Sequence, residues 1–140
     1  MKKIFVFFLL MSSIILSNNL VNDEDVKMYV SNYINTCKTG DVNKSAAFII
    51  YQGEDTKRHL QSFLNVNTPE ELRKADRLFK RINALLKLSE TFEVNIENKS
   101  KPDNLDLFDI SVSFISKSNT IKINISVIKL ANSYGILEVK

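Results

Sequence analysis

Few side chains in this sequence could carry out acid–base or nucleophilic chemistry. His59 is the single histidine among the 140 residues and lies in the segment TKRHLQSF. An imidazole titrates near neutral pH, so His59 could act as a general base. A catalytic triad would need a nucleophile oriented toward this ring, and no motif in the sequence supplies one. The simpler interpretation is that His59 is a partly exposed residue of a loop or short helix.

Cys37 is the single cysteine, and it falls on the apolar stripe of a predicted helix. This position favours a buried, unreactive thiol, because a reactive cysteine needs an activating neighbour. One cysteine cannot form an internal disulfide, so the hydrophobic core alone must hold the fold together. A zinc site would need further ligands at recognisable spacing, and a phosphate-binding loop would need clustered glycines, which the sequence lacks. We therefore expect no metal and no cofactor.

Three tyrosines are candidates for ligand binding. Tyr29 and Tyr33 are one helical turn apart, and Tyr51 follows the second predicted helix. On an inward face, their rings could line an apolar pocket and present polar hydroxyl groups to a ligand. The alternative is an ordinary core in which the hydroxyl groups reach the rim. Together with His59, these tyrosines form the set of candidate ligand-binding residues.

The elements that must position these side chains begin with a helix that starts near residue 23. Its apolar residues recur at the spacing of one helical face, and they are Val26, Tyr29, Val30, Tyr33, Ile34 and Cys37. Gly40 can adopt the left-handed conformation that ends this helix, and Asp41 can cap a second, short helix. The apolar residues expected on the second helix are Val42, Ala46, Ala47, Ile49 and Ile50. The sequence thus predicts a tight corner between two helices.

A third helix is predicted from the segment NTPEEL, in which Thr68 and Glu71 have the spacing of a capping box. The preceding residues 51–67 indicate a turn at Gly53 and a brief helical piece near residues 60–64. The apolar stripe of the third helix comprises Leu72, Ala75, Leu78, Phe79, Ile82, Leu85 and Leu86. Its other face carries Arg73, Lys74, Arg77, Lys80, Arg81 and Lys87. That face could bind an anionic surface, but the acidic residues of the chain balance it, which favours an ordinary solvated face.

The hydrophobic period changes from about 3.6 to 2 residues at Ser89, which predicts strands for the rest of the chain. Apolar residues alternate with polar ones in three segments that start near residues 92, 108 and 121, and a shorter segment follows from residue 134. Short connections indicate a four-stranded antiparallel meander. Consecutive apolar residues at Val127 and Ile128 predict a bulge in the third strand. In the last strand, we expect Tyr134, Ile136 and Glu138 on one side.

The first 17 residues predict a secretory signal peptide, because Lys2 and Lys3 precede an apolar run that ends at Leu16. Such a run covers about 20 Å as a helix, which is short of the hydrocarbon core of a bilayer. We therefore expect residues 18–22 to be a short linker and residues 23–140 to be a single secreted or periplasmic domain without a stable membrane span. Cleavage would remove two lysines and lower the formal charge from +3 to about +1. A near-neutral domain is not expected to bind nucleic acid.

The segment YVSNYINTCKTGDVNKSAAFI, together with the order of helices and strands, resembles bacterial secreted members of the nuclear transport factor 2-like fold. This fold belongs to the cystatin-like group, and the resemblance extends to small bacterial envelope domains of unknown function. It implies an α+β, cone-shaped domain in which three N-terminal helices pack on a curved four-stranded antiparallel meander. It also implies a pocket at the wide end of the cone. Fold alone does not decide function, because members include both enzymes and inert binding modules.

Three hypotheses for function remain. The leading one is a secreted or periplasmic, non-catalytic binding module whose partner is an unknown small molecule or an envelope protein. The second is a small-molecule lyase or isomerase, with His59 or Glu138 as base and Tyr33 or Tyr51 as proton donor. The third is an envelope assembly protein that forms a homodimer through its sheet face, with Leu107, Ile115 and Leu130 as contacts.

Overall fold

The computed structural model describes residues 22–140, so the predicted signal peptide and most of the predicted linker lie outside the described residues. The helices are α1 (Asp23–Thr39), α2 (Val42–Ala46) and α3 (Pro69–Lys87), and a 3-10 turn, η1, spans Pro102–Asn104. The strands are β1 (Thr91–Ser100), β2 (Leu107–Ile115), β3 (Thr120–Lys129) and β4 (Tyr134–Val139). This order confirms the predicted α+β class. Within residues 22–140, no helix is long and apolar enough to cross a membrane.

The corner between α1 and α2 forms as predicted, but α2 is shorter than expected. Gly40 ends α1 in the left-handed conformation, with φ at 84°, and the Asp41 carboxylate accepts a hydrogen bond from the Lys44 N–H at 3.0 Å. Ile49 and Ile50, which we expected on this helix, instead form strand-like bridges with Ile136 and Phe63. Backbone pairing with β4 thus takes over where the helix was predicted to continue.

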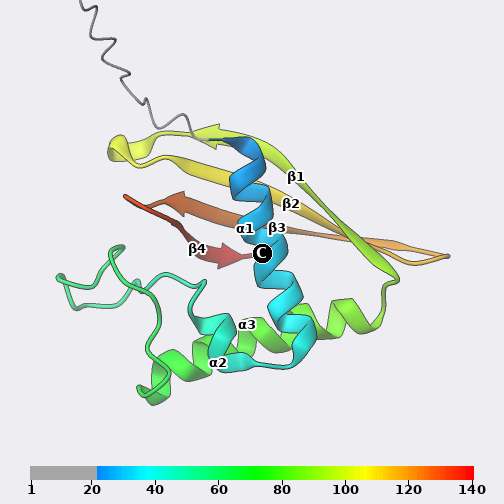
Figure 1. The fold of residues 1–140 in the computed structure, drawn as a ribbon, viewed down its shortest axis with the longest axis horizontal. Coiled ribbons are helices and arrows are strands. Elements are labelled where there is room, and N and C mark those ends of the chain that lie inside the picture. The colour runs from blue at the N-terminus through cyan, green and yellow to red at the C-terminus, as the bar shows by residue number, and fades with distance from the viewer. Residues whose placement is uncertain (1–21) are drawn as a thin grey trace, which may run out of the picture.

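The four strands form one antiparallel sheet in the order β1-β2-β3-β4, as predicted. The register places the apolar residues of neighbouring strands opposite one another, for example Val112 opposite both Val94 and Ile123. Figure 1 shows α1 crossing one face of the sheet, with α2 beside α3, so the helices cover that face. The sheet is open and consistent with a cone whose interior is the hydrophobic core. That core includes Val30, Ile34, Ala75, Ile82, Ile110, Val112, Ile125, Val127 and Ile136.

The bulge predicted in β3 lies instead in the facing strand, β4. Ser126 pairs with Glu138 and Val127 pairs with Ile136, so Leu137 is the extra, unpaired residue. The bulge shifts the alternation of β4, and both Ile136 and Val139 are buried while Glu138 is exposed. Glu138 therefore does not share the inward side with Ile136, contrary to the sequence prediction. A second irregularity, at Glu97 in β1, had no signal in the hydrophobic pattern.

The segment of residues 48–64 closes the outer edge of β4. The Ile50 N–H donates to the Ile136 carbonyl at 2.9 Å, and the Ile136 N–H donates to the Phe48 carbonyl at 2.8 Å. The chain then turns back, and the Leu64 N–H donates to the Ile49 carbonyl at 2.9 Å. No helix forms between residues 51 and 67, so the predicted helical piece is wrong. The pairing with β4 satisfies backbone groups that would otherwise remain open at a sheet edge.

Candidate functional site

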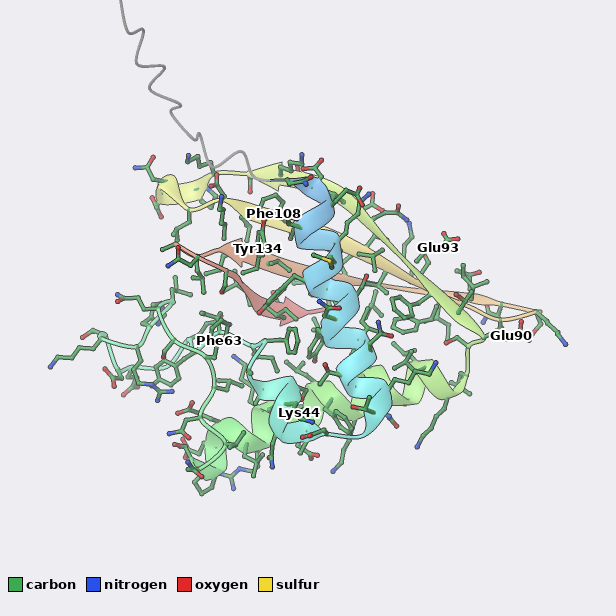
Figure 2. All side chains as sticks on the ribbon, viewed as in Figure 1. Lys44, Phe63, Glu90, Glu93, Phe108 and Tyr134 are labelled. Atoms are coloured by element: carbon green, nitrogen blue, oxygen red, sulfur yellow. The ribbon has the colours of Figure 1, made fainter. Side chains whose placement is uncertain are left out.

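An aromatic cluster occupies the interior beneath α1. Tyr29 contacts Phe48 and Tyr134, with ring centroids 5.2 and 5.7 Å apart, and the Tyr33 ring lies 5.8 Å from that of Phe48. Tyr134 also meets Phe108 edge-on at 6.3 Å, and Figure 2 labels this pair on β4 and β2. Two of the candidate ligand-binding tyrosines, Tyr29 and Tyr33, are therefore packed against other aromatic rings.

The hydroxyl groups of these two tyrosines have different surroundings. The Tyr29 hydroxyl donates to the Phe48 carbonyl at 3.0 Å. Tyr33 is 0% exposed, and its hydroxyl makes no well-formed hydrogen bond within residues 22–140; the weakly polar Cys37 thiol is its neighbour. Burial raises the pKa of both hydroxyl groups well above the ordinary value, with Cys37 adding to the shift at Tyr33. Burial also raises the pKa of the Cys37 thiol to about 12, so this buried thiol stays protonated and unreactive, as expected.

Tyr51 belongs to a separate network that anchors the loop of residues 51–67 to α3. The Arg58 guanidinium lies over the Tyr51 ring, 4.0 Å from its centroid, and binds both Glu71 carboxylate oxygens at 2.8 Å. Glu71 also accepts the Asn65 N–H at 2.6 Å. Arg58, followed by Asn65, holds the pKa of the Glu71 carboxyl below its usual range although desolvation opposes this shift.

This network replaces the capping box predicted at the start of α3. Thr68 is the N-cap residue, but its side chain makes no capping hydrogen bond. Glu71 is only 8% exposed and is directed to Arg58 and Asn65. A bidentate, charge-assisted pair is stronger than a single capping bond, so Arg58 determines the orientation of Glu71.

The two predicted bases lie outside the aromatic cluster. His59 is exposed, and its Nδ1 lies 3.1 Å from the Gly53 carbonyl oxygen. Glu138 is exposed and forms an ion pair with Lys140 at 3.1 Å. The structure therefore brings neither side chain into the interior beside Tyr33.

Three surface hollows share lining residues from the segment 51–54, α3 and β4, and we name them together the α3–β4 groove. The first, of about 570 Å³, is lined by Tyr51, Gln52, Gly53, Glu54, Leu64, Thr68, Glu70, Glu71 and Lys74. The second, of about 320 Å³, is lined by Lys74, Arg77, Leu78, Arg81, Leu137, Glu138 and Val139. The third, of about 600 Å³, is lined by Gln52, Lys74, Leu107, Asp109, Ser126, Leu137, Glu138 and Lys140. Lys74 lines all three, so it connects them.

Side chains from the flanking elements fix the walls of this groove. The Gln52 amide donates to the Leu137 carbonyl at 2.6 Å, and Arg81 donates to the Val139 carbonyl at 2.8 Å. These bonds cap carbonyl groups of β4 and fix Gln52 and Arg81 against this strand. Burial, followed by the neighbouring Arg77, lowers the pKa of the Lys74 ammonium.

Solved structures with the same arrangement of helices and strands identify the fold. A designed protein named "Rd1NTF2_05 with long sheet" aligns with a TM-score of 0.52 and 9% identity, over 83% of this chain and 94% of its own. A "Putative NTF2-like transpeptidase" from Campylobacter jejuni aligns with a TM-score of 0.50 and 18% identity, over 84% and 98%. The chain has a nuclear transport factor 2-like fold. No family model and no curated protein matches its sequence.

The nuclear transport factor 2-like fold predicted from the sequence is therefore confirmed, whereas the groove was not predicted. Of the four candidate residues, Tyr51 alone lines one of the three hollows of the groove. The helical spacing predicts that the basic residues of α3 form one continuous face. Which of them border β4 depends on how α3 packs, and no local pattern gives that packing.

No group of three or more His, Cys, Asp or Glu side chains within residues 22–140 is arranged to hold a metal ion.

Proposed function

We propose that this protein is an exported, non-catalytic binding module of the bacterial envelope that holds its ligand in the α3–β4 groove. The observation that carries this proposal is the convergence of three hollows on Lys74, outside an interior that aromatic side chains occupy. A binding site needs a concave surface with a few polar groups and an apolar floor. The groove offers both kinds of surface along one sheet edge.

The placement of titratable groups supports binding over isomerase or lyase chemistry. Such chemistry needs a base and a proton donor within hydrogen-bond reach of one substrate. His59 and Glu138 are exposed, whereas the Tyr33 hydroxyl is fully buried. The other candidate donor, Tyr51, lies under the Arg58 guanidinium, and its hydroxyl accepts the Asp55 N–H at 3.3 Å.

The Campylobacter jejuni protein is named as a transpeptidase, and a cysteine thiol is one nucleophile that group-transfer enzymes use. In this chain the Cys37 thiol is buried and protonated, so it does not support such an activity.

The experiment is a nuclear magnetic resonance screen of the isotopically labelled protein against a library of small polar and charged compounds. We expect compounds that bind to shift backbone amide signals of α3 and β4, with no new product signals during prolonged incubation. Amide shifts centred on Tyr29, Tyr33 and Phe48 would contradict binding in the groove. A product signal would contradict the non-catalytic role.

Export is tested separately by expression of the full chain in a bacterial host and analysis of cell fractions. We expect a periplasmic or secreted product that begins near residue 18. Retention of residues 1–17 in a cytoplasmic product would contradict the proposed compartment.

The sheet face gives weaker support to the homodimer hypothesis. Leu107, Ile115 and Leu130 are each only partly exposed, and their strands carry mainly polar residues on that side. Stable homodimer interfaces are usually more apolar than this. We therefore do not propose a homodimer through the sheet face.

A further inference from the structure

The basic face of α3 divides into two sets of side chains with different surroundings. Lys74, Arg77 and Arg81 follow intervals of three and four residues, and all three line the hollow beside β4. Lys80 lies outside that hollow and pairs with Asp76 at 2.7 Å. Within residues 22–140, no carboxylate forms an ion pair with Lys74 or Arg77. These two cations are therefore uncompensated although they are neighbours.

The surroundings of this pair favour an anion with an apolar part. Lys74 is half-buried, and Leu78, Leu137 and Val139 provide an apolar floor beside it. Arg77 is exposed, but its charge disfavours the neighbouring half-buried Lys74 ammonium, and a bound anion would offset this repulsion. Glu138 also lines the hollow, but Lys140 pairs with its carboxylate at 3.1 Å. Arg81 donates to the Val139 carbonyl, which fixes its position beside β4, and its charge adds to those of Lys74 and Arg77, which have no carboxylate partner among the described residues.

We propose that Lys74 and Arg77 bind the head group of an organic anion, a carboxylate or phosphate monoester, whose apolar chain lies on Leu78, Leu137 and Val139. Arg77 can bind two oxygens of such a group in parallel, and Lys74 can add a third charge-assisted bond. The hollow measures about 320 Å³. At the liquid volume of water, that space holds about ten non-hydrogen atoms, which fits an eight-carbon acid. This inference rests on the proposed binding function and names the class of its ligand.

The probes are octanoate, octyl phosphate, octanol and octylammonium, titrated into the labelled protein. We expect saturable amide shifts in residues 74–81 and 136–139 with one or both anions. Tighter binding of octanoate would identify a carboxylate head group, and tighter binding of octyl phosphate a phosphate. Octanol and octylammonium share the chain but lack the negative charge, and we expect them to bind at least about tenfold more weakly. Equal binding of octanol would overturn the head-group site.

Variants assign the binding to the named side chains. We expect the double substitution Lys74→Gln with Arg77→Gln to weaken octanoate binding by about tenfold or more, because both head-group donors are lost. The matched control, Arg73→Gln with Lys80→Gln, removes the same charge from the same helix and should change affinity by about twofold at most. Amide spectra of both variants check that the fold is retained. An equal loss of octanoate affinity in both variants would show that only general electrostatic attraction contributes, and it would overturn the proposal.

The two proposals fail in distinguishable ways. If neither anion binds while library compounds still shift amides of the groove, the head-group assignment is wrong and the binding function stands. If library compounds shift amides of the interior instead, the proposed function itself is wrong.

Discussion

The hydroxyl groups of Tyr29 and Tyr33 show how one side chain type can have opposite energetic effects one helical turn apart. The Tyr29 hydroxyl donates to the Phe48 carbonyl, whereas the buried Tyr33 hydroxyl makes no well-formed hydrogen bond and, among the described residues, has only the weakly polar Cys37 thiol beside it. A buried polar group without a hydrogen bond costs free energy, so Tyr33 destabilises the fold relative to a phenylalanine of the same shape. The sequence predicted that both rings face inward, but the hydroxyl partners depend on residue 48, which lies in another segment.

We predict that Tyr33→Phe raises the free energy of unfolding by about 1 kcal/mol, because it removes the unpaired hydroxyl and keeps the ring. The matched control Tyr29→Phe should lower it by about 1 kcal/mol, because one hydrogen bond to the Phe48 carbonyl is lost, although the Ile136 N–H still donates to that carbonyl. Urea unfolding of the three proteins measures both changes. A loss of stability in Tyr33→Phe equal to that in Tyr29→Phe would show that the Tyr33 hydroxyl has a partner.

Glu71 gives a pH-dependent prediction at the same scale. Its pKa in the folded protein is lower than the ordinary value of 4.5, so the unfolded chain takes up the proton first as pH falls. The stabilisation by the carboxylate is therefore complete above about pH 4.5 and is lost as pH falls through the folded pKa. We expect Glu71→Gln to be less stable than the unsubstituted protein by about 2 kcal/mol at neutral pH.

Urea unfolding at a series of pH values tests this prediction. The difference in stability between Glu71→Gln and the unsubstituted protein should shrink as pH falls from about 4.5 through the lower folded pKa of Glu71, because below that pKa both side chains are uncharged. The exposed Glu54→Gln serves as a control, and we expect it to change stability by less than about 0.5 kcal/mol. A Glu71→Gln difference that stays constant with pH would contradict the role of the ionised carboxylate.

The helices and strands illustrate which features local sequence can predict. Gly40, Asp41 and the change of hydrophobic period at Ser89 act through neighbouring residues, and the structure confirms the corner and the meander. The end of α2, the network of Glu71 and the bulge at Leu137 depend on contacts with distant segments. The hydrophobic pattern alone therefore wrongly placed Ile49 and Ile50 in a helix, and wrongly placed Glu138 on the same side of its strand as Ile136.

We predict that Gly40→Ala lowers the free energy of unfolding by about 1 kcal/mol, because φ is 84° and an added Cβ disfavours the left-handed conformation. No atom lies within 4 Å of the position that this Cβ would take, so the cost is conformational rather than steric. Gly40→Asn should cost less than half as much, because asparagine tolerates this conformation better. Thermal unfolding of both variants measures the difference, and equal losses would contradict the conformational cause.

At the scale of the whole molecule, the sequence predicted the architecture but not the candidate site. The order of amphipathic helix and alternating strands determines a nuclear transport factor 2-like fold, which the structural neighbours support. The groove arises where Gln52, α3 and the bulged β4 meet, and these segments are far apart in the chain. The expected pocket residues Tyr29 and Tyr33 are instead part of the packed aromatic cluster.

We expect the ligand to bind beside β4 and not within the aromatic interior. Intermolecular nuclear Overhauser effects between the chain of bound octanoate and the protein test it most directly. We predict contacts from octanoate to the methyl groups of Leu78, Leu137 and Val139, which line the groove. Contacts to the rings of Tyr29, Tyr33 and Phe48 instead would place the ligand inside the cone and contradict the claim.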